Sequence, residues 1–166
     1  MTRTAKGTVL LTVHIAATVG LLGADLALVA LGIAGARGAD PRTVYPAAHL
    51  LGSSLAAPLA VLSLTTGLLL AALTSWGLLR YWWVTIKLAL TVVLTSLLLV
   101  VLVPALTRVA DLATGQTPQL ITDAQRLRLA VAPAAAALML ALSLGLATSK
   151  PRWNVGRLPA FSRRRR

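Results

Sequence analysis

The sequence predicts an all-α membrane protein, a bundle of four transmembrane helices with both termini in the cytoplasm. Three observations lead to this fold class. The chain of 166 residues is 57% apolar, which is more apolar surface than a soluble domain of this size can bury. The apolar residues gather into four runs, each long enough to cross a bilayer. Most charged residues lie between or beyond these runs.

The first predicted helix covers about residues 7–35 and follows the short basic start MTRTAK. At about 1.5 Å of rise per residue, this run exceeds the hydrocarbon thickness of a bilayer. A cleavable signal peptide is the alternative, since AGA at 34–36 resembles a cleavage site. The run is about twice as long as a signal-peptide core and Asp25 interrupts it, so we expect a membrane span.

The second predicted helix covers about residues 47–73 and follows a polar link. Pro46 suits the first helical turn, where the missing N–H group costs little. Pro58 should kink the helix. The hydroxyl groups of Ser53 and Ser54 are candidates to satisfy the carbonyl that this kink frees.

An aromatic and basic segment at residues 74–93, TSWGLLRYWWVTIKLALTVV, leads from the second span into the third. Trp and Tyr prefer the membrane–water boundary, from which Arg and Lys can reach lipid headgroups. We interpret the start of this segment as a short cytoplasmic loop. The third predicted helix then covers about residues 82–103, and Pro104 should end it.

The fourth predicted helix covers about residues 127–148, after a long link at 105–126. TDAQ, which lies at the end of this link, has the spacing of a capping box. In such a box Thr122 caps the helix and Gln125 reaches back to it.

A basic cytoplasmic tail, residues 151–166, follows the four-span membrane domain of residues 1–150. Lys and Arg are enriched at both chain ends and in the loop between the second and third spans, so the positive-inside rule places both termini in the cytoplasm. We attribute the net charge of +12 to topology and to contact with anionic lipid headgroups, rather than to nucleic-acid binding. The expected location is a bacterial plasma membrane, where a homo-oligomer or a membrane partner would cover exposed helix faces.

A polar layer is expected in the cytoplasmic half of the bundle, because polar side chains inside a membrane are best tolerated facing other helices. Depths counted from helical rise place several such residues at one level. They are His14, Thr65 or Thr66, Lys87 and Ser143. Gly67 lies near this level, and its small size would leave space for a ligand.

Asp25 lies about three helical turns from His14 and therefore on the same face of the first helix. An unpaired Asp in hydrocarbon costs about 2.5–3.5 kcal/mol, so we expect its side chain to face inward. The hydroxyl groups that could hydrogen-bond it are those of Ser53, Ser54, Thr95 and Ser96.

His49 is expected at the outer end of the second span, roughly 25 Å from His14 along the membrane normal by helical rise. The two histidines are therefore too far apart to be opposite ligands of one haem. Structural roles are the alternatives to ligand binding. His14 would hydrogen-bond a neighbouring helix, Lys87 would extend its charge to the membrane surface, and His49 would be an interfacial residue.

A family resemblance rests on three features: a histidine early in the first span, SLTTGLLLA late in the second, and YWWVTIKLALTVV leading into the third. Together they resemble a superfamily of bacterial four-helix membrane proteins that includes the copper-resistance protein D family and the haem-binding membrane protoporphyrinogen oxidase. WGLLRYWWVTIKL is most similar to an actinobacterial family of predicted integral membrane proteins of unknown function. The resemblance implies that His14 and Lys87 are functional positions. The aromatic run that usually follows the histidine is replaced here by AATVGLLGADL.

Three functions remain open from the sequence. The first is a non-enzymatic integral membrane protein acting as an accessory subunit, because no nucleotide loop, metal motif or nucleophile constellation is visible. The second is a protein that handles b-type haem or porphyrin, with His14 on the iron and Lys87 and Thr66 beside the cofactor. The third is a small ion or proton pathway through Asp25 and His14. The chain has no cysteine, which excludes disulfides and thiolate metal ligands from all three.

Overall fold

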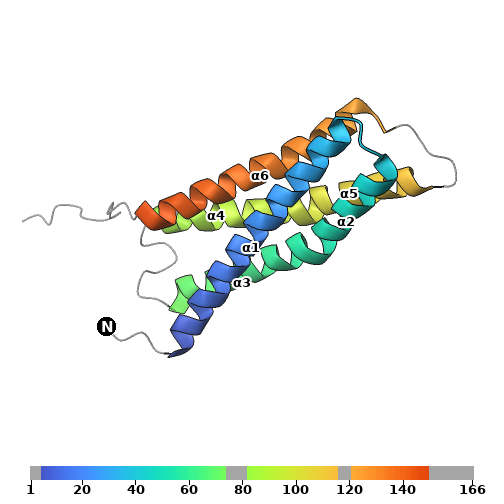
Figure 1. The fold of residues 1–166 in the computed structure, drawn as a ribbon. Coiled ribbons are helices and arrows are strands. Elements are labelled where there is room, and N and C mark those ends of the chain that lie inside the picture. Colours follow the sequence, from blue (N-terminus) through green and yellow to red (C-terminus); the bar gives the residue numbers. More distant parts are fainter. Residues whose placement is uncertain (1–4, 74–81, 116–120, 150–166) are drawn as a thin grey trace, which may run out of the picture.

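The computed structural model describes residues 5–73, 82–115 and 121–149, and it confirms the all-α, four-span fold class (Figure 1). Residues 1–4 of the basic start, the aromatic loop at 74–81 and the basic tail are the expected features that lie outside the described ranges. Within the described ranges, four segments are long and apolar enough to cross a membrane. They are Gly7–Ala36, Pro41–Leu73, Thr85–Thr114 and Asp123–Gly145.

The first span, α1 (Ala5–Ala36), is one unbroken helix that crosses the bundle diagonally (Figure 1). It packs along α6 (Asp123–Ser149) on one side, and against α2 (Pro41–Leu51) and α3 (Ala57–Leu73) on the other. Spacings of three and four residues place its buried side chains on one helix face. They include Ala17, Leu21, Ala24, Asp25 and Leu28.

The second span begins at Pro41 and not near residue 47, so its predicted start is wrong. The reason is the cap: Asp40 accepts a hydrogen bond from the Arg42 N–H and another from the Thr43 hydroxyl, both at 3.1 Å. Pro41 then occupies the first helical turn, where a missing N–H group is tolerated. Pro46, which was expected in that position, lies inside the helix.

Two π-helical turns interrupt the spans, and each ends two residues before a proline. Gly52–Ala56 precedes Pro58 in the second span, and Leu98–Leu102 precedes Pro104 in the third. In a π turn, a backbone N–H donates to the carbonyl five residues earlier, whereas in an α-helix it donates to the carbonyl four residues earlier. The N–H groups of Ala57 and Val103, for example, donate to Gly52 and Leu98. The wider turn gives the proline ring room and lets the helix continue.

The predicted end of the third span at Pro104 is therefore wrong. α4 (Trp82–Leu97) continues through the π turn into α5 (Val103–Thr114), with Pro104 in the first turn of α5. The long link predicted at residues 105–126 is mostly helix, because Pro104 follows a π turn and does not face an ordinary α-helical carbonyl.

The capping box at the start of α6 is confirmed. The Thr122 N–H donates to Gln125 Oε1 at 2.9 Å, and the Gln125 N–H lies 3.4 Å from Thr122 Oγ1. α6 consequently begins at Asp123, four residues earlier than predicted, and it continues through the buried Pro133.

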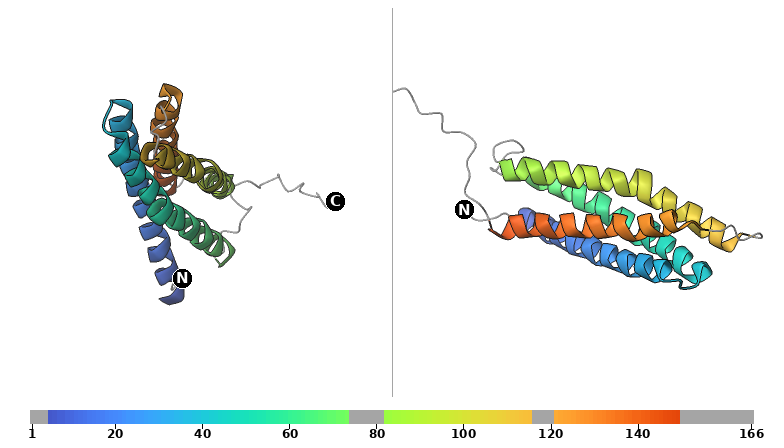
Figure 2. Two further views of the ribbon diagram at one scale, coloured as in Figure 1. Left: turned by 90° about the vertical axis from the view of Figure 1, so that its right-hand side faces the viewer. Right: turned by 90° about the horizontal axis from the view of Figure 1, so that it is seen from above.

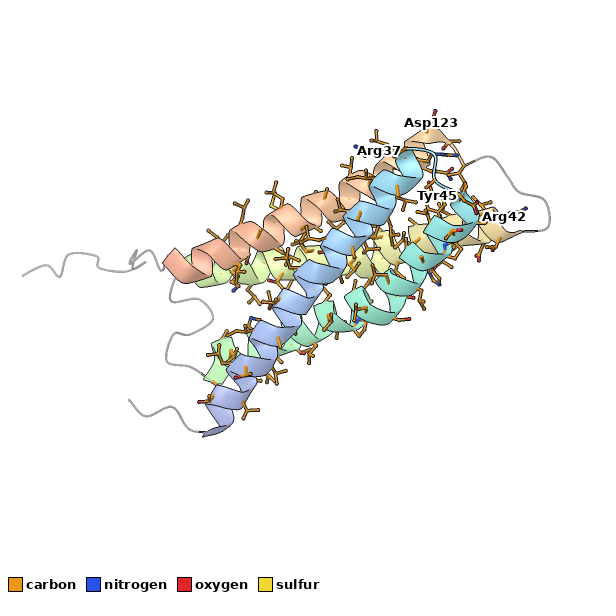
Figure 3. All side chains as sticks on the ribbon, in the orientation of Figure 1. Arg37, Arg42, Tyr45 and Asp123 are labelled. Carbon is orange, nitrogen blue, oxygen red and sulfur yellow. The ribbon has the colours of Figure 1, made fainter. Side chains whose placement is uncertain are left out.

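The spans pack with α2 beside α5 and α3 beside α4, while α6 lies along α1 (Figures 1 and 2). Large apolar side chains cover the outside of the bundle, as expected for surfaces that face lipid. Figure 3 shows Arg37, Arg42, Tyr45 and Asp123 at the same end of the bundle.

The α1 and α6 backbones approach each other closely at Gly32. A Cβ atom on Gly32 would lie 2.7 Å from both the Ala130 Cα and the Leu129 carbonyl oxygen. Small residues allow backbones to approach in this way, and van der Waals packing is a main source of helix association in membranes.

We therefore expect Gly32→Ala to lower the free energy of unfolding by about 1–3 kcal/mol, because a methyl group would push against the α6 backbone. The measurement is the midpoint of thermal or SDS-induced unfolding of the purified protein. Gly23→Ala on the same helix is the matched control, since nothing lies within 4 Å of its Cβ position. Equal midpoints for the two variants would contradict this packing.

Candidate functional site

His14 joins α1 to α3 through a hydrogen bond. His14 Nδ1 lies 3.0 Å from Thr66 Oγ1, and Thr66 Oγ1 is 2.6 Å from the Leu62 carbonyl. A threonine hydroxyl has one proton, which is directed to Leu62, so the imidazole must donate from Nδ1. This network assigns a proton to Nδ1, so in the neutral ring the lone pair lies on Nε2.

A second hydrogen bond joins the same helices one turn along. Thr18 Oγ1 donates to the His14 carbonyl at 2.8 Å and lies 2.9 Å from Ser63 Oγ. Because the Thr18 proton is directed to the carbonyl, Ser63 must be the donor in the second contact. The hydroxyl groups and the His14 Nδ1–H thus satisfy one another, as helix association in a membrane requires.

The expected polar layer is present in part. Thr66 is the member that meets His14, while Thr65 is exposed and bonds only carbonyls of its own helix. Lys87 is half-buried on α4. Ser143 is buried on α6.

The space expected beside Gly67 is filled by protein. The His14 Cε1 atom lies 3.1 Å from the position that a Cβ on Gly67 would take. Gly67 therefore accommodates the imidazole ring itself, and the expectation of ligand space at this glycine is wrong.

His49 has a partner that the sequence did not reveal. Its Nδ1 lies 3.2 Å from Thr107 Oγ1, which donates to the Val103 carbonyl at 3.0 Å. The pair joins α2 to α5 by the same arrangement as His14 and Thr66. Thr107 fell in a predicted link and not on a helix, so sequence reasoning had no reason to pair it with His49.

Asp25 is a buried acidic residue without a partner among the residues that the structure describes. Its side chain is only 3% exposed. Among the described residues, no hydrogen bond or ion pair reaches its carboxylate. The expected partner Ser53 instead donates to the His49 carbonyl at 2.8 Å, and Ser54 and Ser96 are exposed.

Asp25 lines a cavity of about 380 Å³. Its walls come from α1, α4, the π turn at Leu98–Leu102 and α6, with single residues from α3 and α5. Most of the lining is Ala, Leu, Val and Met. The four polar or charged lining residues are Asp25, Thr91, Thr95 and Arg128. None of His14, Thr66 and Lys87 lines this cavity.

The polar lining residues differ in their hydrogen bonding. Thr91 Oγ1 donates to the Lys87 carbonyl at 2.8 Å. Thr95, one helical turn further, is 6% exposed, and no hydrogen bond to its hydroxyl is present within the described part of the chain. Arg128 is exposed, near the start of α6. The cavity therefore contains two buried polar side chains, Asp25 and Thr95, whose hydrogen-bonding capacity is unused.

Tyr45 is a further buried side chain, 1% exposed, whose hydroxyl has no hydrogen-bond partner in the described ranges. It packs against Gly35, whose carbonyl accepts a hydrogen bond of 3.2 Å from Arg126 Nη1. The adjoining cavity is about 10 Å³, room for about one water molecule. This position anchors helix ends and has no space for a ligand.

Comparisons with protein-family models, curated proteins and solved structures found no match to this chain. Within residues 5–73, 82–115 and 121–149, no group of three His, Asp or Glu side chains is arranged to hold a metal ion. The functional argument therefore depends on the geometry around Asp25.

Thr66→Val should lower the free energy of unfolding by about 1–2 kcal/mol, because it removes the hydroxyl that accepts a hydrogen bond from His14 across two helices. Detergent-solubilised protein unfolded by heat or SDS provides the measurement. Thr65→Val is the control, since Thr65 is exposed and contacts no other helix through its hydroxyl. If both variants unfold like the wild type, the bond between His14 and Thr66 has no structural role.

Proposed function

We propose that this protein is a non-enzymatic, multi-pass membrane protein that binds a small molecule inside the bilayer through Asp25. The observation that carries the proposal is the buried carboxylate without a partner in a largely apolar cavity of about 380 Å³. This volume falls within the range typical of small-molecule sites, about 300–1,000 Å³. On the distribution of Lys and Arg, we also propose a bacterial plasma membrane with both termini in the cytoplasm.

The energetics favour a functional role for Asp25. An unpaired Asp at the centre of a membrane helix costs about 2.5–3.5 kcal/mol. Intramembrane polar groups with a structural role are expected to have a partner in another helix, as His14 and His49 have. Asp25 has no such partner among the described residues, so a bound molecule would supply the interaction that the fold lacks.

Binding explains the site better than catalysis or transport does. The described lining of the cavity offers one carboxylate, two threonine hydroxyls and the exposed guanidinium of Arg128, which do not form a base–nucleophile pair. A proton pathway from Asp25 to His14 would have to pass the buried Leu21, which lies between them on α1. An accessory subunit that holds a small molecule for a partner protein is consistent with these features.

The π turn at Leu98–Leu102 adds independent support, because it forms part of the cavity wall through Leu98, Val101 and Leu102. Single π turns inside α-helices occur frequently at functional sites.

Asp25→Leu should raise the free energy of unfolding of the ligand-free protein by about 1–3 kcal/mol, because it removes a buried charge that no protein group compensates. The measurement is the unfolding midpoint in detergent. Asp111→Leu, at an exposed position of α5, is the control and should change stability by about 0.5 kcal/mol or less. Lower stability of Asp25→Leu would mean that the carboxylate has a structural partner, and the proposal would fail.

Haem binding at His14 is a second candidate, favoured by one observation. The hydrogen bond from Nδ1 to Thr66 leaves the Nε2 lone pair free, as in metal-bound histidines whose other nitrogen is held by an acceptor. The geometry fits a macrocycle poorly, because the ring packs on Gly67 and the hydrogen bonds close α1 against α3. A porphyrin could approach His14 only from the Nε2 side.

We therefore expect protein purified from haem-replete cells to show no Soret band, either oxidised or reduced with dithionite. Visible absorption spectroscopy of the wild type beside His14→Ala tests this expectation. A Soret band that disappears in the variant would establish His14 as an iron ligand and make haem binding the leading function.

A further inference from the structure

We propose that the cavity binds a lipophilic amine, a molecule with an apolar body and a protonated nitrogen that pairs with Asp25. The inference rests on the proposed function, since it requires that the cavity bind a small molecule. It names the chemical class of that molecule from the charge, hydrogen-bonding groups and lining of the site.

The charge of the site selects a cation. Asp25 is the one carboxylate among the described lining residues, and it lies deeper in the bundle than the exposed Arg128. An anionic molecule would be repelled by Asp25, and a neutral one would leave its charge unbalanced. A cation removes that imbalance, and the low dielectric of the interior strengthens the resulting ion pair.

The oxygen atoms available select an organic cation over a metal ion. Ca²⁺ takes six to eight oxygen ligands, and Mg²⁺ requires near-octahedral coordination. The side-chain oxygens available here are those of Asp25, Thr95 and Thr91, and the Thr91 hydroxyl is already bonded to the Lys87 carbonyl. An ammonium group has three N–H donors, which match the two carboxylate oxygens and the Thr95 hydroxyl.

The lining of the cavity matches an apolar body. Ala132, Ala135 and Ala136 of α6 and Ala60 of α3 leave the volume open, and Leu and Val side chains form the other walls. An apolar molecule gains little by moving from lipid into such a cavity, because lipid tails are equally apolar. Affinity must therefore come mainly from the pairing of nitrogen and carboxylate, and the site should distinguish an amine from the corresponding alcohol.

The test uses the full chain in lipid nanodiscs and two pairs of probes with identical apolar bodies. The rigid pair is 1-adamantylamine and 1-adamantanol, and the flexible pair is octylamine and octanol. Binding is measured by equilibrium dialysis at pH 7 with empty nanodiscs subtracted. The variants are Asp25→Asn, Asp111→Asn as the matched control, and Ala136→Leu, which narrows the cavity.

We expect saturable binding of at least one amine to the wild type, with the matching alcohol at least tenfold weaker. Asp25→Asn should weaken binding of that amine at least tenfold, and Asp111→Asn should leave it unchanged. Ala136→Leu should weaken it also, which places the probe in the cavity. Thermal unfolding of each variant shows that a loss of binding is not a loss of folding.

Other results separate the two proposals. Equal binding of amine and alcohol that Asp25→Asn still weakens would overturn the amine inference and leave the proposed function, because Asp25 would still hold the small molecule. Binding that Asp25→Asn does not change would overturn both. Wild-type affinity in Ala136→Leu would place the probes elsewhere and overturn the inference. No saturable binding of any of the four probes would overturn both the inference and the proposed function.

Discussion

The constraint on which this structure depends is that lipid offers no hydrogen bonds, so polar groups inside the spans must be satisfied by protein. The two π turns meet this requirement for the backbone ahead of Pro58 and Pro104. Threonine and serine hydroxyls meet it by bonding carbonyls of their own helix. The two histidines meet it with threonines on neighbouring helices. Against this background, the buried carboxylate of Asp25, which has no partner among the described residues, identifies a candidate site.

The position of Asp25 follows from how α1 is held. Toward its N-terminus, His14 and Thr18 bond α3, while toward its C-terminus, Gly32 brings α1 against the backbone of α6. Asp25 lies between these two attachments on a helix that crosses the bundle diagonally (Figure 1). The small side chains of α6 at this level leave a cavity where larger ones would have filled the bundle. The same crossing that attaches α1 to α3 and to α6 thus leaves space beside Asp25.

Sequence reasoning succeeded where one residue type has one physical consequence. Long apolar runs predicted the four spans, and TDAQ predicted the cap of α6, which forms with Thr122 and Gln125 as expected. It failed where neighbouring structure changed that consequence. Pro104 was expected to end a helix, but the π turn before it allows the helix to continue to Thr114. Pro46 was expected to start a helix that Asp40 and Pro41 begin earlier.

The sequence by itself determined that the helices face lipid, how many spans there are, and that the first span contains an acidic residue. These follow from composition and from the length of apolar runs, which local chemistry fixes without knowledge of neighbours. Only the tertiary structure decided which polar residues are paired. It joined His14 to Thr66 and His49 to Thr107, filled the space at Gly67 with imidazole, and left Asp25 and Thr95 facing an apolar cavity. Pairing depends on the rotation and crossing of whole helices, and these are set by close contacts such as Gly32 against α6 that no single segment specifies.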